Sequence, residues 1–151
     1  MGQTRHGLTQ DVMDAKMDEH FGFEVRDDIE GVLATLSNDV EHDIVGWPTG
    51  PTHGREGARG FYNTLFADLA DGQVKTLKRL YGDRFLVDES LWSGRAAGRP
   101  FGLEGGNRPL AFRLLHIVEF TESGEIAREN VWLDLAAIFQ QLPQSAEGVA
   151  A

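Results

Sequence analysis

Hydrophobic residues recur at intervals of three to four positions over much of the first third of the chain. Residues 8–25 carry one such stripe with breaks in it, and residues 27–37 carry a more regular one. This spacing matches the turn of an α-helix and predicts two helices. At the start of the second helix, Asp27 and Glu30 resemble a capping box.

Polar and apolar residues then alternate over residues 39–47, which predicts a strand that is buried on one side only. The residues that face one way are Val40, His42 and Ile44. The stretch "GPTHG" (residues 50–54) predicts a turn. A third helix with one apolar face is predicted over residues 55–72, with Gly72 as its end.

From here on the pattern favours strands. The four predicted strands cover residues 73–82, 83–94, 108–122 and 125–133. A glycine-rich loop joins the second to the third, and "ESGE" predicts a hairpin between the last two. Residues 134–142 form a short predicted helix that Pro143 ends. This order predicts an α+β fold, with an antiparallel or mixed sheet and helices on one face.

The length of 151 residues suits one domain with one hydrophobic core. We therefore expect a single domain over residues 1–151, in which the small polar residues 144–151 form a flexible tail. The formal net charge is -10. This charge argues against nucleic acid or an anionic membrane as a partner, because both bind clustered Lys and Arg side chains.

The chain has no cysteine, which excludes disulfides, thiolate nucleophiles and thiolate metal ligands. Its first residues lack the apolar segment of a secretory signal. No stretch approaches the roughly 18 apolar residues that a membrane span requires. We therefore expect a cytoplasmic protein.

Four stretches of the chain resemble the SnoaL-like branch of the nuclear-transport-factor-2-like superfamily. The stretch "VEHDIVGWPTGPTHGREGARGFYNTLFADLADG" resembles the first strand, the Gly-Arg-Glu-Gly turn and the third helix of that family. "LWSGRAAGRPFGLEGGNRPLAFRLLHIVEF" resembles its long hairpin with a glycine-rich turn. "ESGEIAREN" resembles its "dGkIveh" hairpin, and "DLAAIFQQLP" resembles its "DxxGLLxQLG" ending. The resemblance spans roughly residues 27–143.

This resemblance implies a strongly curved sheet, wrapped by about three N-terminal helices and a short C-terminal helix into a cone-shaped barrel with an internal apolar pocket. It also implies a homodimer formed through the outer sheet face, a small apolar organic ligand and no cofactor. Members of the superfamily include polyketide cyclases, ketosteroid isomerase, limonene epoxide hydrolase and scytalone dehydratase. The fold alone therefore does not define a function.

Two histidines are candidates for proton transfer. His116 is the one titratable residue on an otherwise apolar face of its predicted strand, and imidazole titrates near neutral pH. The alternative is a core histidine whose ring nitrogen bonds to a backbone carbonyl. His42 lies similarly between two apolar residues, and its alternative is a surface histidine at the pocket rim.

The last predicted strand places Asn130, Trp132 and Asp134 on one face. The resemblance implies that Asp134, just before the closing helix, is an acid/base in the pocket, where a carboxyl group would have a raised pKa. The alternative is an N-cap, because Asp is a favoured capping residue and a helix follows it. Asn130 would orient a carbonyl group or a water, and Trp132 would form a flat wall.

Four more residues are pocket candidates. Glu89 lies on an apolar row of its strand, where it is either a pocket group or part of a dimer contact. Trp47, Tyr62 and Trp92 are expected to form pocket walls. The histidines and acidic residues lack the spacing of a metal motif, so no metal site is expected.

The known catalytic sets of the superfamily are incomplete in this chain. The ester-cyclase branch carries a "GTHTG" stretch in its long hairpin, and Ala96 stands here where its histidine would lie. The Asp-Arg-Asp set of the epoxide hydrolases and the Tyr with paired Asp of ketosteroid isomerase have no clear counterpart.

Two kinds of function remain open. The first is a cofactor-independent isomerase, cyclase or dehydratase that moves a proton on an apolar or polyketide-like substrate, as polar residues set singly into apolar strand faces suggest. The second is a non-catalytic ligand-binding protein or dimeric scaffold of the same fold.

Overall fold

A computed structural model describes residues 7–143 of the protein, so the predicted flexible tail lies outside the described residues. The helices are α1 (Gln10–Val25), α2 (Ile29–Ala34), α3 (Gly54–Asp68), the short 3-10 helix η1 (Pro100–Gly102) and α4 (Leu135–Gln141). The strands are β1 (Leu36–Ile44), β2 (Thr52–His53), β3 (Ala70–Gly82), β4 (Phe85–Ala96), β5 (Arg108–Phe120) and β6 (Ile126–Leu133).

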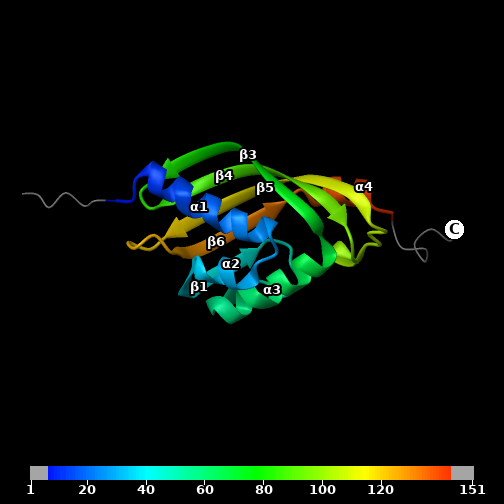
Figure 1. Ribbon diagram of the computed structural model, residues 1–151, viewed down its shortest axis with the longest axis horizontal. Coiled ribbons are helices and arrows are strands. Elements are labelled where there is room, and N and C mark those ends of the chain that lie inside the picture. Colours follow the sequence, from blue (N-terminus) through cyan, green and yellow to red (C-terminus); the bar gives the residue numbers. More distant parts are fainter. Residues whose placement is uncertain (1–6, 144–151) are drawn as a thin grey trace, which may run out of the picture.

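The strands form one six-stranded sheet in the order β2-β1-β6-β5-β4-β3. Strand β1 runs parallel to β6, and all other neighbours are antiparallel. Figure 1 shows α1, α2 and α3 on one side of the curved sheet and α4 at the end where the described chain stops. The sheet is mixed and open, and the fold is the predicted α+β fold of helices wrapped around a curved sheet.

Helix α1 covers the inner face of the sheet because its apolar residues recur on one side. The hydroxyl of Thr9 caps the helix by accepting a hydrogen bond from the Val12 amide. The main hydrophobic cluster joins this helix to α2, α3 and the sheet. Its buried members are Met13, Met17, Phe21, Val32, Leu33, Leu36, Val40, Ala58, Tyr62, Leu86, Val118, Phe120 and Ile126.

A second hydrophobic cluster lies towards α4, at the other end of the sheet. Its buried members are Leu69, Ala96, Leu103, Leu110, Phe112, Leu114, Ile138 and Leu142. Leu65 packs against both clusters. The space between the two clusters is where the candidate site is found.

Several predicted boundaries were wrong by a few residues. Helix α3 ends at Asp68, not at Gly72, because β3 begins at Ala70 and takes the following residues into the sheet. Asp28 caps α2 by accepting a hydrogen bond from the Gly31 amide, so the capping box predicted from Asp27 is not formed. The predicted turn at residues 50–54 contains the two-residue strand β2, which pairs with β1.

The predicted alternation of β1 and β5 is confirmed. Every second residue of β5 is buried, from Leu110 to Phe120, and His116 is among them. Val40, His42 and Ile44 are buried in β1. Among the described residues, no helix is both long enough and apolar enough to cross a membrane.

Candidate functional site

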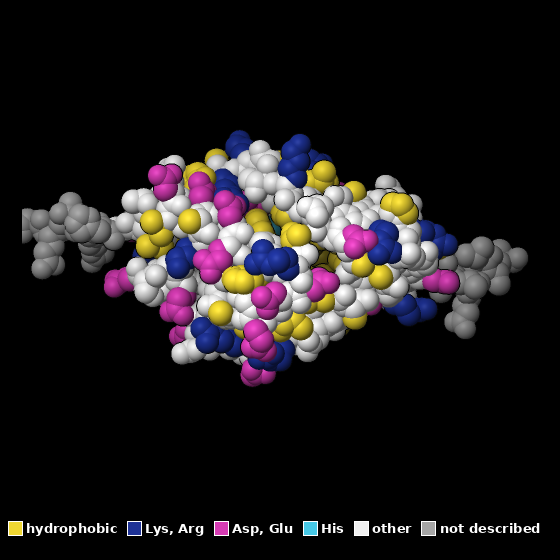
Figure 2. Space-filling view, viewed as in Figure 1, with side chains coloured by type: hydrophobic (Ala, Val, Ile, Leu, Met, Phe, Trp, Pro, Cys, Tyr) yellow, Lys and Arg dark blue, Asp and Glu magenta, His cyan; other side chains and the backbone are white. Residues whose placement is uncertain are grey.

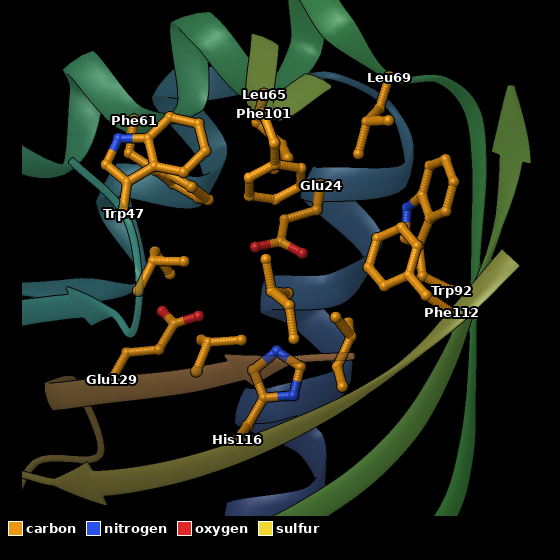
Figure 3. Close-up of a pocket in the computed structure, with 14 residues that line it drawn as sticks. Glu24, Trp47, Phe61, Leu65, Leu69, Trp92, Phe101, Phe112, His116 and Glu129 are labelled. Carbon is orange, nitrogen blue, oxygen red and sulfur yellow. The ribbon is translucent and has the colours of Figure 1, made fainter. Parts of the chain in front are cut away.

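A cavity lies between the helical layer and the inner face of the sheet, where the two hydrophobic clusters meet. Its empty volume is about 510 Å³, with the open mouth included. Figure 3 shows side chains from both layers pointing into it. The lining residues are Glu24, Ile44, Trp47, Phe61, Leu65, Leu69, Trp92, Phe101, Phe112, Leu114, His116, Glu129, Val131 and Leu133.

Aromatic rings form two opposite walls of this cavity (Figure 3). On one side Trp92 stacks on Phe112, with ring centroids 5.2 Å apart. On the other side Trp47 meets Phe61 edge to face at 5.1 Å and Phe101 at 5.6 Å. The glycine-rich loop between β4 and β5 thus supplies Phe101 to the wall. Such walls suit a flat or bulky apolar ligand.

Three titratable side chains, those of Glu24, Glu129 and His116, interrupt the apolar lining. The two glutamates both contact one further histidine, His20. The Nε2 of His20 lies 3.1 Å from Glu24 Oε1 and 3.3 Å from Glu129 Oε2. His20 is fully buried on α1, one helical turn before Glu24, whereas Glu129 comes from β6. The phenol of Tyr62, from α3, donates a hydrogen bond of 3.5 Å to Glu129. Figure 3 shows the Glu24 carboxylate pointing into the cavity between the aromatic walls.

The protonation of His20 follows from its neighbours. The hydroxyl of Thr35 donates its hydrogen to the Val32 carbonyl at 2.6 Å, so it accepts from His20 Nδ1 at 2.7 Å. Nδ1 therefore carries a hydrogen. Nε2 faces two carboxylates, which are acceptors when ionised, so it also carries one. His20 is an imidazolium held between Glu24 and Glu129.

The pKa values of His20 and Glu129, which are both buried, shift in the directions that keep both side chains charged. Burial alone would lower the pKa of His20, but the Glu129 and Glu24 carboxylates outweigh it and raise that pKa well above its usual value. Burial would raise the pKa of Glu129, but the His20 imidazolium overcomes this effect and lowers it. Both members of the pair thus stay charged at neutral pH.

His116 projects into the same cavity from β5 and is backed by a second charged network (Figure 3). It lies directly across from Asp88 of β4 in the sheet, and its Nδ1 is 3.6 Å from Asp88 Oδ1. Asp88 is fully buried and accepts hydrogen bonds from Arg79 at 2.8 Å and Thr76 at 3.1 Å. Ser90 also donates to it.

Asp88 is held as an anion. Burial raises its pKa, but the contacts with His116, Arg79 and Ser90 outweigh burial and lower the pKa to about 2. Arg79 also pairs with Asp14 and Asp18 of α1, so the network anchors that helix to the sheet. The negative charge beside Nδ1 favours a hydrogen on that nitrogen, which leaves Nε2 to exchange a proton with a ligand.

The structure brings three of the residues predicted from the sequence together in the cavity: His116, Trp47 and Trp92. Tyr62 is fully buried, and its hydroxyl contacts His20 and Glu129. His42 is buried and lines an adjoining hollow, together with Trp47. Burial lowers the pKa of His42, and its Nε2 has no hydrogen-bond partner in the described part of the chain.

The remaining predicted residues lie outside the cavity. Glu89, Trp132 and Asp134 border a shallow hollow on the outer face of the sheet. Trp132 is 39% exposed, and Glu89 lies 3.7 Å from Arg113. Asn130 is buried and donates a hydrogen bond to Asp43 at 2.9 Å, so it is engaged away from the cavity lining.

The alternation predicted for β6 was right, but its cavity-facing side was assigned wrongly. Val131 and Leu133 face the cavity, because burial of apolar surface fixes which side of a strand turns inward. Asp134 caps α4, and its Oδ1 accepts a hydrogen bond of 3.1 Å from the Ala137 amide. This position favours the capping interpretation, and a catalytic role for Asp134 stays a prediction.

Sequence reasoning missed Glu24, Glu129 and His20, although signals for them exist. Glu129 alternates with Val131 and Leu133, so it is a carboxylate on an apolar row. His20 and Glu24 are four residues apart and lie beside the apolar stripe of α1. An acidic residue that continues an apolar face is the pattern that marks these positions.

The same three residues are the group among the described ones that offers metal-ligating atoms, which lie within 4.8 Å of one another. A neutral His20 with its hydrogen on Nδ1 would present Nε2 to a metal ion. The imidazolium form has no free lone pair for a metal ion, and its Nε2 faces both carboxylates, at 3.1 and 3.3 Å. The three residues thus hold a proton on His20 between two carboxylates.

Comparisons with known proteins agree with this fold. A family model described as SnoaL-like polyketide cyclase matches residues 15–142. No curated protein matches the sequence. TsrD from Streptomyces laurentii has a similar structure, with 19% sequence identity, a TM-score of 0.76, and coverage of 89% of this chain and 96% of that one.

Two further solved structures show the same fold. An LEH-like epoxide hydrolase from M. tuberculosis has 14% sequence identity and a TM-score of 0.68, over 87% of this chain and 90% of that one. A protein with a ketosteroid isomerase-like fold from Catenulispora acidiphila, in complex with trimethylamine, has 16% identity and a TM-score of 0.71, over 93% and 98%. At these identities the similarity establishes the fold.

Proposed function

The chain belongs to the family of SnoaL-like polyketide cyclases, and from this premise we propose that it binds an apolar small molecule in the cavity and moves a proton on that ligand without a cofactor. The observation that carries the proposal is the placement of Glu24 and His116. Both side chains can exchange a proton, and both lie in the apolar, aromatic cavity wall. Glu24 contacts the buried His20, and His116 contacts the buried Asp88.

Glu24 acts as the base in this proposal. Its carboxylate faces the ligand and removes a proton from a carbon or hydroxyl group, while its other contact is the His20 imidazolium. The imidazolium stabilises the negative charge of the carboxylate pair before the reaction. When Glu24 gains a proton, the hydrogen of His20 Nε2 shifts its interaction towards Glu129, 3.3 Å away.

His116 acts as the acid in this proposal. Asp88 faces Nδ1, which keeps its hydrogen, and the imidazolium form of His116 gives its Nε2 proton to the atom where negative charge develops, which leaves a neutral ring. A base and an acid on one cavity serve isomerisation, dehydration and ring closure alike. The solved structures of similar fold include an LEH-like epoxide hydrolase and a protein in complex with trimethylamine.

Deuterium exchange tests the proposal before the natural substrate is known. Aryl ketones that bind are incubated with the protein in heavy water, and mass spectrometry follows the exchange of their α-hydrogens. We expect catalysed exchange that falls by at least about a hundredfold in Glu24→Gln and in His116→Gln, the usual contribution of a general acid or base. Glu89→Gln, on the outer sheet face, is the matched control and keeps the wild-type rate.

Two results would contradict the proposal. One is a set of ketones that bind in the cavity but show no catalysed exchange. The other is exchange that persists in both Glu24→Gln and His116→Gln. Binding is followed by tryptophan fluorescence, because Trp47 and Trp92 line the cavity. Bound ligands without exchange would favour the non-catalytic carrier.

We also propose that the protein is a homodimer through the outer sheet face. Large apolar side chains are exposed on the strands there, and Leu115 pairs with Trp132 across β5 and β6. The exposed large hydrophobic residues of the described strands are Leu77, Leu80, Phe85, Leu115 and Trp132. Sedimentation equilibrium is expected to give twice the chain mass of 16.7 kDa, and Trp132→Glu is expected to give the single mass.

A further inference from the structure

The charges around the cavity do not balance. Two carboxylates, Glu24 and Glu129, share one imidazolium, that of His20. One negative charge is therefore left at the cavity wall. No Lys or Arg lines the cavity in residues 7–143, and the positive charge of a protonated His116 is matched by Asp88, 3.6 Å from its Nδ1. An uncompensated charge in a poorly hydrated site is costly, and a ligand of opposite charge removes that cost.

The walls around this charge favour a particular kind of cation. Five aromatic residues line the cavity: Trp47, Phe61, Trp92, Phe101 and Phe112. Aromatic faces attract organic ammonium groups, and the attraction is strongest where water is excluded. A strongly hydrated metal ion gains nothing from such walls.

His116 adds a further polar group to the cavity wall. Its side chain is almost completely buried, and its Nδ1 makes no hydrogen bond within the described part of the chain. The ring lines the cavity on the side of the sheet. Because Nδ1 faces Asp88, Nε2 is the ring nitrogen that is left to contact a ligand.

The approach to the cavity is acidic as well. A hollow that adjoins it is lined by Glu24, Leu65, Leu69 and Trp92, which also line the cavity, and by Asp27. Burial and then the neighbouring Asp71 raise the pKa of Asp27. Figure 2 shows a hollow near the centre of this face, with hydrophobic side chains in its depth and acidic side chains beside it. A cation that enters here is attracted by acidic side chains along the way.

We propose that the ligand of this cavity is an organic cation, a tertiary or quaternary ammonium compound with apolar substituents. Its positive charge lies against Glu24 and the carboxylate pair, and its substituents pack on the aromatic walls. The inference rests on the proposed function in one respect, namely that the cavity is the ligand site. It adds the charge of the substrate, which the fold and the family leave open.

Three probes of similar size and different charge test the inference: phenyltrimethylammonium, its uncharged carbon analogue tert-butylbenzene, and the anion phenylacetate. Each is titrated into the full-length protein in the presence of EDTA, and the fluorescence of Trp47 and Trp92 is recorded. We expect the ammonium probe to bind at least about tenfold more tightly than tert-butylbenzene, as one desolvated cation–π and charge contact would give. Phenylacetate is expected to bind most weakly.

Two substitutions locate the origin of the preference. Glu24→Gln removes the charge but keeps the shape, so it should weaken the ammonium probe by about tenfold and leave tert-butylbenzene unchanged. Asp27→Asn lies in the approach and should slow association of the ammonium probe, with a smaller effect on its equilibrium affinity. Glu89→Gln, an acidic residue of the outer face, is the control that changes neither.

The outcomes separate this inference from the proposed function. Equal binding of the charged and uncharged probes, or tighter binding of phenylacetate, overturns the inference and leaves the cavity as a site for neutral or anionic ligands. An ammonium preference that Glu24→Gln does not reduce also overturns it. Failure of all three probes to bind overturns both the inference and the use of the cavity as the ligand site.

Discussion

The Nδ1 nitrogen of His20 lies 2.7 Å from the hydroxyl oxygen of Thr35, and that hydroxyl donates to a backbone carbonyl. This short chain of hydrogen bonds fixes which ring nitrogen of His20 faces Glu24 and Glu129. Thr35→Val keeps the shape but leaves a buried N–H without an acceptor, so it should lower the free energy of unfolding by about 1–3 kcal/mol. Thr35→Ser keeps the hydroxyl and should lose much less. Urea unfolding of both variants checks this, and equal losses would contradict it.

The raised pKa of His20 makes stability depend on pH on the alkaline side. The stabilising contribution is complete below the pKa of the unfolded chain, about 6.5. It is lost as pH rises towards the folded-state pKa of about 10. Glu24, Glu129 and Tyr62 are the titratable groups that face His20. We expect the urea midpoint of the wild type to fall over this range, and His20→Gln to flatten the profile. A wild-type midpoint that stays level would count against the ion pair.

Asp88 has the opposite dependence. Its lowered pKa means that its contribution is complete above the unfolded value, about 3.9, and is lost as pH falls through about 2. Asp88→Asn removes the charged partner of Arg79 and His116, which should cost about 1.5–3 kcal/mol at neutral pH. Between about pH 3.9 and about pH 2, the variant should also lose less stability than the wild type. Acid titrations followed by circular dichroism compare the two proteins, and parallel curves would exclude this role.

Asp134 should matter for stability and little for ligand binding. Asp134→Ala removes the cap of α4 and should cost about 0.5–2 kcal/mol, whereas Asp134→Asn still caps and should cost less. Both variants should retain ketone binding and hydrogen exchange, because Asp134 lies outside the cavity lining. Loss of exchange in a stable Asp134→Asn would restore the acid/base interpretation.

The fold follows closely from local sequence pattern, because periodic burial leaves a clear signature. The alternation of β5 was sufficient to place His116 inward, and the structure has it in the cavity wall. In β6 the alternation was also right, but the side that carries Asn130 and Trp132 was taken for the pocket side. The inward side is the one with Val131 and Leu133, and Glu129 lies on it.

The cluster that backs the cavity was out of reach for a physical reason. His20 and Glu129 are far apart in the sequence, and they meet because α1 packs across the inner face of the sheet. Nothing local in either segment encodes that crossing. The same holds for Phe101, which reaches the cavity because its glycine-rich loop folds back over the end of the sheet. Contacts between elements, and the charges they bring together, required the three-dimensional arrangement.

The central claim is that a protonated His20, shared by Glu24 and Glu129, stands behind the reactive face of the cavity. NMR spectra of protein labelled with nitrogen-15 histidine, correlating ring nitrogens with their hydrogens, test it directly. At about pH 8, where a free imidazole is neutral, we predict one histidine with hydrogens on both ring nitrogens, and its signals should disappear in His20→Gln. A neutral His20 with a single ring hydrogen at that pH would contradict the account.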